Sequence, residues 1–208
     1  MPKAFSEKER ARIRARLLEA GRTCFARYGL RKTTVADLVE PAGISKASFY
    51  LFFESKEVLY TDVLMAEMPA MMERLIEGSF GKTSDARDAL MLFMRGVVRE
   101  MEANPLARIL LQDPTELDRL AAALDVDRLL EQAQEMFTPV TEEIRAAQAR
   151  GAIVAGDPQE LVYALGMIKL FPLNRGRVPE PLYTRMLDQA CQVIADGLTC
   201  PARSGRRA

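Results

Sequence analysis

The side chains of this sequence best suited to a binding reaction are hydrogen-bond donors gathered in one short stretch. They are Thr33, Thr34, Lys46, Ser48, Tyr50 and Lys56. Lys46 and Ser48 can each donate to a base edge or to a phosphate, and Ala47 between them offers a methyl to thymine. The Tyr50 hydroxyl and the Lys56 ammonium suit phosphates that flank a groove. Thr33 and Thr34 stand at an expected helix amino terminus, where free amides favour anions.

Residue types for catalysis and metal binding are scarce. The sequence has no His, which excludes Ser-His and Cys-His nucleophile systems and every His-based zinc or iron site. Its three cysteines, Cys24, Cys191 and Cys200, form no C-x-x-C pair, which argues against a zinc ribbon or a thioredoxin-like motif. No motif of paired carboxylates or lysines for acid–base chemistry is present. We therefore expect no enzyme activity, no metal and no cofactor.

Charge is distributed unevenly along the chain. Residues 1–60 hold 12 Lys+Arg and 7 Asp+Glu, a net charge of +5, whereas residues 61–202 hold 14 and 22, a net charge of −8. Residues 203–208 add three Arg, so the total is zero. A basic amino-terminal part on an acidic body indicates that one part meets an anion, and nucleic acid is the leading candidate because counterion release rewards clustered basic residues.

The same sequence gives no sign of a membrane or secretory segment. No apolar run reaches the ~18 residues of a membrane span, and the first 30 residues contain no apolar signal-peptide region. We expect a cytoplasmic protein that makes no membrane contact.

The elements that must position the donors are helices, since long segments follow a 3.6-residue period. A first helix is expected from a cap at Ser6, with Glu9 three residues later, to Gly29. A short helix capped by Thr33 or Thr34 follows, and Pro41 makes its last turn irregular. Gly43 then allows a sharp turn, and Ser45 can cap another short helix from Lys46 to about Leu51. Two short helices joined by a tight glycine turn form a helix-turn-helix pattern.

The residues of this pattern resemble the DNA-binding region of the TetR family of bacterial transcriptional regulators. The resemblance lies in TTVADL at 33–38, AGISKASFY at 42–50 and FESKEVL at 53–59, and it extends to Ala20-Gly21, Cys24-Phe25 and Tyr28-Gly29. It covers roughly residues 10–60. Pro41 departs from the pattern, because such proteins more often carry a helix former there. The resemblance implies that recognition-helix and phosphate-contact positions fall on Thr33, Thr34, Lys46, Ala47, Ser48, Tyr50 and Lys56.

The rest of the chain reads as longer helices, and resembles that family only in architecture. Helices are expected at about 55–78 with a kink at Pro69, and at 84–103, 106–112, 115–149 (one or two), 157–171 and 181–198. The fold class is thus all-α, with about nine helices in total. The expected division is a three-helix helix-turn-helix domain at 1–54, a ligand-binding and dimerisation domain at 55–202, and a disordered basic tail at 203–208.

Methionines recur along the helices of the larger expected domain. Met is flexible and polarisable, and it recurs on surfaces that accept varied apolar ligands, although ordinary core packing is the alternative for each position. In the resembling family this region binds a small ligand that weakens DNA binding. The resemblance therefore implies an apolar or amphipathic effector, in a pocket that we expect to be lined by Met68, Met72, Phe93, Met94, Val97, Met101, Phe137, Val140 and Met167.

The two carboxyl-terminal helices are too apolar for a pair that faces solvent. In similar proteins they pair with their mates in a four-helix dimer interface, although an intramolecular core is the alternative. The expected interface residues are Leu161, Leu165, Ile168, Tyr183, Leu187, Ala190 and Ile194. A two-fold dimer presents two recognition helices about one turn of DNA apart, so we expect a palindromic operator.

The expected mechanism is a ligand-induced shift of the population between conformations with high and low DNA affinity. A ligand that favours the wrong spacing of the recognition helices lowers DNA affinity, and the helix that starts at Lys56 connects the two domains. Repression is the usual outcome in the resembling family. Two alternatives stay open: a redox-sensing regulator that uses Cys191 or Cys200, and a small-molecule-binding helical protein with weak DNA binding.

Overall fold

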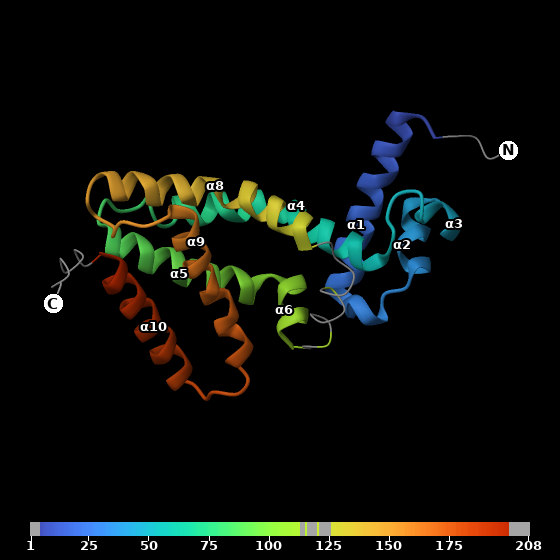
Figure 1. The fold of residues 1–208 in the computed structure, drawn as a ribbon. Helices are drawn as coiled ribbons and strands as arrows, with labels where there is room; N and C mark the ends of the chain where they lie inside the picture. Colours follow the sequence, from blue (N-terminus) through green and yellow to red (C-terminus); the bar gives the residue numbers. More distant parts are fainter. Residues whose placement is uncertain (1–4, 113–114, 116–119, 121–125, 200–208) are drawn as a thin grey trace. The chain divides into compact units, whose positions relative to one another are not determined.

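The computed structural model describes residues 5–112, 115, 120 and 126–199, and within them every regular element is a helix. The expected tail at 203–208 and part of the expected helix at 115–149 lie outside the described residues. The elements are α1 (Glu7–Lys32), α2 (Val35–Ala42), α3 (Lys46–Phe49), α4 (Lys56–Glu77), α5 (Ala86–Ala103), α6 (Pro105–Gln112), α8 (Val126–Ala149), α9 (Pro158–Gly166), the 3₁₀ helix η1 (Met167–Asn174) and α10 (Leu182–Thr199) (Figure 1). The all-α fold class is confirmed. In the described residues, no helix is both long and apolar enough to cross a membrane.

Contacts divide the chain into two compact units. The first comprises the described parts of 1–67 and 104–129, and the second comprises those of 68–103 and 130–208. This grouping differs from the expected division at residues 54 and 55, because the first half of α4 packs with α1. Leu59, Tyr60 and Val63 of α4 are fully buried in the core of the first unit.

The helix starts follow the local chemistry that the sequence offers. Ser6 and Glu9 form a reciprocal capping box, in which each side chain accepts from the other residue's backbone N–H, at 2.9 and 3.3 Å. Asp157 caps α9 by accepting from Gln159 N–H at 2.8 Å, with Pro158 at the first helical position. Gly29, with φ 78°, breaks α1 one turn before its end. These caps confirm the expected starts of α1 and α9.

The core of the first unit lies where α1, α2, α3 and the first half of α4 meet. Phe25 of α1 and Tyr60 of α4 make an edge-to-face contact with ring centroids 5.0 Å apart. Gly21 permits this close approach, since a Cβ there would lie 3.1 Å from Val63 Cγ2. The Tyr60 hydroxyl donates to the Leu106 carbonyl at 2.8 Å, which ties α6 to the same core.

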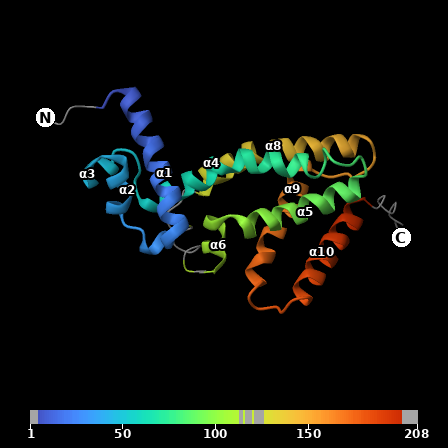
Figure 2. The same ribbon diagram turned by 180° about the vertical axis from the view of Figure 1, so that it is seen from behind.

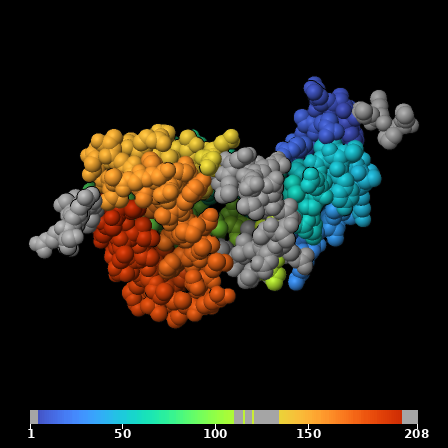
Figure 3. All heavy atoms as spheres, viewed as in Figure 1, coloured from blue at the N-terminus to red at the C-terminus, as the bar shows by residue number. Residues whose placement is uncertain are grey.

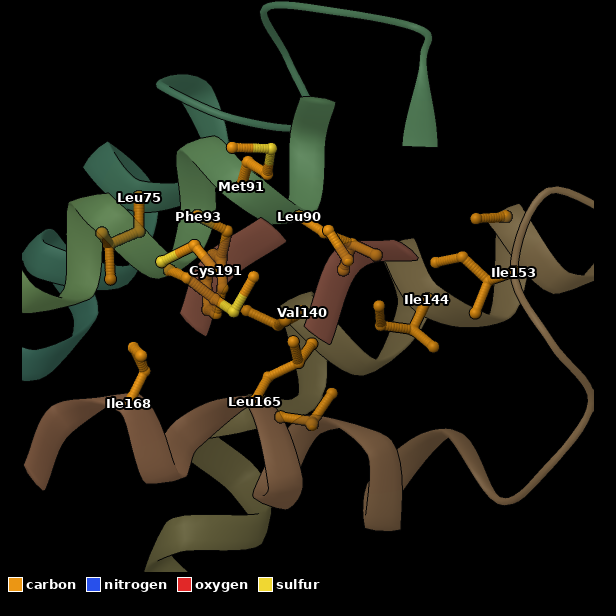
Figure 4. Close-up of a cluster of buried hydrophobic side chains, with 14 of the residues drawn as sticks. Leu75, Leu90, Met91, Phe93, Val140, Ile144, Ile153, Leu165, Ile168 and Cys191 are labelled. Carbon is orange, nitrogen blue, oxygen red and sulfur yellow. The ribbon is translucent and has the colours of Figure 1, made fainter. Parts of the chain in front are cut away.

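The second unit is built around α5, which packs against α10, η1 and α9. Figures 1 and 2 show the second half of α4 and α8 along one side of α5 and α10 along the other. Figure 4 shows side chains from all these elements meeting in one apolar cluster that includes Leu90, Val140, Leu165 and Cys191. The single helix expected at 157–171 is instead α9 followed by η1. η1 ends at Asn174, two residues after Pro172, which has no N–H to donate.

Candidate nucleic-acid interface

The turn between α2 and α3 is set by one glycine. Gly43 has φ 69° and ψ 34°, a left-handed conformation that side chains disfavour, and it follows Ala42 directly. The amides of Gly43 and Ile44 donate back to the carbonyls of Glu40 (3.2 Å) and Val39 (3.3 Å), which closes the end of α2. Pro41 remains inside α2, so the expected irregularity does not shorten the helix.

Capping then fixes where α3 begins. Ser45 accepts a hydrogen bond from the Ser48 N–H at 3.1 Å, as expected, and the two hydroxyls lie 2.9 Å apart. The helix proper ends at Phe49 rather than near Leu51, and a turn closed by the Leu51 N–H on the Ser48 carbonyl (3.1 Å) follows.

The two faces of α3 differ sharply. Phe49 is fully buried and Phe53 is 3% exposed, and both pack into the core of the first unit, so these two rings hold the segment in place. On the other face Lys46 and Ala47 are exposed, and Tyr50 is 60% exposed. Ser48 is half-buried beside Ser45. The segment therefore presents an ammonium, a methyl and a phenol from a rigid base.

Thr34 stands at the exposed start of α2, close in sequence to this face. Its hydroxyl donates to Asp37 at 2.7 Å and accepts weakly from the Asp37 N–H at 3.4 Å, and the Thr34 N–H also donates to Asp37 at 2.8 Å. These hydrogen bonds lower the pKa of Asp37, and the nearby charge of Lys46 adds a smaller lowering. Thr34 is exposed at a helix amino terminus, the position expected of a phosphate contact.

Two of the expected phosphate contacts are instead engaged within the protein. Thr33 is fully buried, and its hydroxyl donates to the Gly29 carbonyl at 2.7 Å, so its side chain is not presented at the surface. Lys56 is turned inward, and its ammonium donates to the carbonyls of Leu30 (2.7 Å), Arg31 (3.2 Å) and Thr33 (2.8 Å). An ammonium has three N–H donors, so all of them are used at the end of α1. Lys56 is thus a cap for α1, where a cation also suits the helix dipole.

Leu51, at 58% exposure directly after Tyr50, was not singled out from the sequence. It extends the exposed face with an apolar side chain. Its carbonyl accepts from Arg10 of α1 at 3.1 Å, which holds the turn against the first helix. The signal available in the sequence was the buried spacing of Phe49 and Phe53, which leaves Leu51 on the opposite side.

Comparison with known proteins agrees with this geometry. The family model for "Bacterial regulatory proteins, tetR family" matches residues 17–63. The HTH-type transcriptional repressor Rv1474c of Mycobacterium tuberculosis is 30% identical over 173 residues, which cover 78% of this chain and 80% of that protein. The chain belongs to the TetR family. It is a helix-turn-helix transcriptional regulator that binds DNA, and such regulators are not enzymes.

Other relatives extend the likeness at the level of fold. Two further curated relatives match over only about a third and a quarter of their own lengths, at 34% and 45% identity. A TetR-family regulator (ECA1819) from Pectobacterium atrosepticum has a TM-score of 0.73 at 19% identity, covering 94% of this chain and 98% of that one. RolR, solved with the ligand resorcinol, has a TM-score of 0.67 at 15% identity, covering 93% and 98%.

The residues expected to line a ligand pocket have four different environments in the second unit. Met72, Phe93, Met94 and Val140 are buried in its core, and Met68, Val97 and Phe137 pack against that core while partly exposed. Met101 is half-buried, outside this cluster. Met167 is 53% exposed and points to the surface, so it does not fit a place inside the unit.

Of the seven expected dimer residues, three are buried within the single chain and four are partly exposed. Leu165, Ile168 and Tyr183 are 0%, 5% and 1% exposed within the single chain, so they belong to its own core. Leu161, Leu187, Ala190 and Ile194 pack against that core as partly buried side chains. The Tyr183 hydroxyl donates to Glu102 at 2.8 Å, and burial, followed by this contact, raises its pKa to about 12.

The exposed apolar side chains of the same elements lie on a different face. They are Met167, Leu170, Leu182, Met186 and Val193, each 42–61% exposed. Figure 3 shows η1 and α10, in orange and red, at the surface of the second unit. Sequence reasoning missed this face, although residues 182, 186 and 193 already form an apolar stripe at helical spacing.

Cysteine geometry gives no support to redox sensing at Cys191. Its thiol is fully buried, and burial raises its pKa, with a smaller opposing effect from Arg95. A reactive thiol needs access and a lowered pKa. Cys200 lies outside the described residues.

Proposed function

We propose that this chain is a homodimeric repressor that binds a palindromic operator and is released by a small apolar or amphipathic effector. The observation that carries the proposal is the exposed face of Lys46, Ala47 and Tyr50, held from behind by buried Phe49 and Phe53. An exposed helix face on a rigid base is what major-groove reading requires. Rv1474c, similar over most of the chain, is named a repressor, which supports the same direction of control.

The contacts with DNA divide by chemistry. Lys46 and Ala47 reach base edges, where an ammonium can donate to guanine and a methyl can contact thymine. Tyr50, Thr34 and Ser48 reach phosphates, which set register rather than sequence preference. Thr33 and Lys56 are left out, because their polar atoms already serve α1.

The homodimer rests on the outer face of η1 and α10. Five large apolar side chains exposed on neighbouring elements are more than the scattered singletons that ordinary surfaces carry. On α10 they share one side of the helix, so two copies can pair these stripes around a two-fold axis. The proposed interface residues are Met167, Leu170, Leu182, Met186 and Val193.

The effector site is proposed within the second unit. Its core brings Met72, Phe93, Met94 and Val140 together, with further side chains packed around them. Flexible methionines accommodate varied apolar shapes. RolR was solved with resorcinol, which shows that a protein of this fold can hold a small ligand. A ligand that prefers the conformation with low DNA affinity releases the operator, through a coupling of typically ~1–3 kcal/mol.

The test is selection of bound DNA from a random duplex pool at near-physiological salt, before and after the protein is unfolded and refolded to remove ligand. We expect a palindrome whose half-sites lie about one helical turn apart. The matched variant Lys46→Met should weaken this enrichment or relax the base preference at one position of each half-site. Enrichment of no sequence by the refolded protein, or of a site without two-fold symmetry, would overturn the proposal.

A further inference from the structure

Two pairs of facing side chains connect α8 and α9, and each pair is called a rung below. The rings of Phe137 and Tyr163 meet edge to face with centroids 6.3 Å apart, and Thr141 lies 3.2 Å from Gln159, oxygen to oxygen. Each helix supplies residues four positions apart, and the order is reversed between them, so the helices run antiparallel. One rung is aromatic and the other is polar.

The polar rung is incomplete. Thr141 is 5% exposed, and its Oγ1 lies 2.9 Å from the Phe137 carbonyl and 3.2 Å from Gln159 Oε1. Gln159 is half-buried as a whole, and its amide nitrogen is buried without a hydrogen-bond partner among the described residues. A glutamine amide offers two N–H donors and one carbonyl acceptor, so its outward half is left without a hydrogen bond.

Buried apolar residues adjoin the two rungs in the sequence of α8 and α9. Val140, next to Thr141, is fully buried, and Val162, next to Tyr163, is 1% exposed. Gln148, also on α8, has a paired amide by contrast, because its Nε2 donates to the carbonyls of Val154 (2.9 Å) and Gly156 (3.1 Å). A buried polar group without a partner destabilises a fold, so one that persists invites a functional explanation.

We propose that Gln159 is the polar anchor of the effector, and that the effector is a neutral apolar molecule bearing a hydroxyl group, a phenol or an alcohol. This inference rests on the proposed function, because it names the chemistry of the molecule that would bind the second unit. The ligand hydroxyl bonds to the outward half of the Gln159 amide, and its apolar body lies against the side chains around Phe137 and Tyr163.

The proton of Thr141 explains why a hydroxyl fits best. A hydroxyl has one proton. When Thr141 gives it to the Phe137 carbonyl, Gln159 turns its NH₂ toward Thr141 and its carbonyl outward. When Thr141 gives it to Gln159, the NH₂ faces outward instead. A ligand hydroxyl both donates and accepts, so it serves either state, whereas a carboxylate or an ammonium serves one and brings a charge into apolar surroundings.

The experiment compares matched probes on the full-length protein. The 4-alkylphenols from 4-methylphenol to 4-butylphenol are titrated calorimetrically, each beside the alkylbenzene that lacks only the hydroxyl. The proteins are wild type, Gln159→Leu, and Gln148→Leu as a control that removes a paired amide on α8. We expect at least one phenol to bind wild type about tenfold more tightly than its alkylbenzene. This preference should vanish in Q159L and persist in Q148L.

Thermal unfolding without ligand supplies a second readout. Q159L should unfold at the same or a higher temperature than wild type, because it removes an unpaired buried amide, whereas Q148L should unfold lower. An equal phenol preference in wild type and Q159L, no binding by any phenol of the series, or a clear loss of stability in Q159L would each overturn the inference. The last result would mean that a buried water already serves the amide.

Operator binding separates this failure from failure of the proposed function. Ligand-free Q159L should bind the selected operator as wild type does, because Gln159 is no part of the α3 face. If wild type selects a palindrome but shows no hydroxyl preference, the role of Gln159 as effector anchor is refuted, and the proposed operator-binding function is retained. If wild type selects no operator, the regulator fails whatever the phenols do.

Discussion

The segment from Thr33 to Lys56 and the segment from α9 to α10 differ in how well local pattern predicts which face is inside. In the first, the exposed face of α3 is the one that the sequence indicated, with Lys46, Ala47 and Tyr50 outward. In the second, the residues chosen for the outside, such as Leu165 and Tyr183, form the inside. Leu165 and Tyr183 lie on α-helices, as Lys46 and Ala47 do, so helix type does not explain the difference.

Length and the number of apolar stripes do explain it. α3 is four residues long, and its buried anchor is Phe49, which Phe53 joins from the segment after the helix, so only one face remains for solvent. α10 is 18 residues long and carries two stripes. Tyr183, Cys191 and Ala195 form the buried stripe, while Leu182, Met186 and Val193 form the exposed one. Helical periodicity finds both stripes, but it cannot rank them, because each alone would look like a core face.

The largest expected effect comes from disrupting the exposed stripe and the buried core separately and comparing the results. The double substitution Met186→Asp and Val193→Asp places charges on the exposed stripe, and we expect dimerisation to weaken by about two orders of magnitude, since buried unpaired charges are costly. Leu165→Ala, on the buried side, should lower the free energy of unfolding by about 2–5 kcal/mol at fixed protein concentration. Sedimentation equilibrium and chemical denaturation measure the two effects.

The controls for this pair follow from burial. The double variant should keep its helical content as a monomer, and Leu165→Ala should remain a dimer at concentrations where it is folded. Dissociation of the Leu165→Ala dimer without unfolding would contradict this assignment of the stripes, and so would a dimer that survives both aspartates. Either result would favour the interface residues that were expected from the sequence.

A smaller effect separates two lysines that look alike in the sequence. Lys56→Met removes three hydrogen bonds from an ammonium to carbonyls at the end of α1, and we expect a loss of about 1–3 kcal/mol in the free energy of unfolding. Lys46→Met should change stability by no more than about 0.5 kcal/mol, since its side chain is exposed.

DNA binding should rank the same two variants in the opposite order. Operator affinity measured over a range of salt concentrations should show a slope lower by about one for Lys46→Met if the lysine meets a phosphate, or a loss of base preference at one position if it meets guanine. Lys56→Met should keep the wild-type slope wherever it is folded. A reduced slope for Lys56→Met would return that lysine to the DNA interface.

What the sequence predicted well is what neighbours in the chain decide. Caps at Ser6, Thr34, Ser45 and Asp157 depend on a residue two or three positions away, and each is present. The inward turn of Lys56 depends on carbonyls 23 to 26 positions earlier, which no local pattern encodes. The unpaired amide of Gln159 likewise appears only when α8 and α9 are packed together.

The smallest expected effect tests a contact that the sequence did predict, the cap of α2. Hydrogen bonds from the Thr34 hydroxyl and backbone N–H lower the pKa of Asp37, so the folded protein holds the carboxylate more strongly than the unfolded chain does. The stabilisation is therefore fully present above the unfolded pKa of about 3.9 and is lost as pH falls through the lower folded pKa. Asp37→Asn has no charge to titrate, so wild type should exceed it in stability near pH 7, and the difference should shrink toward zero in acid.

Amide hydrogen exchange of α2 in the two proteins from pH 7 to pH 3, corrected for intrinsic exchange rates, measures this difference in stability. A difference that stays constant with pH would show that the box acts through shape and hydrogen bonding alone, and that even the locally encoded part of the DNA-binding segment owes nothing to charge.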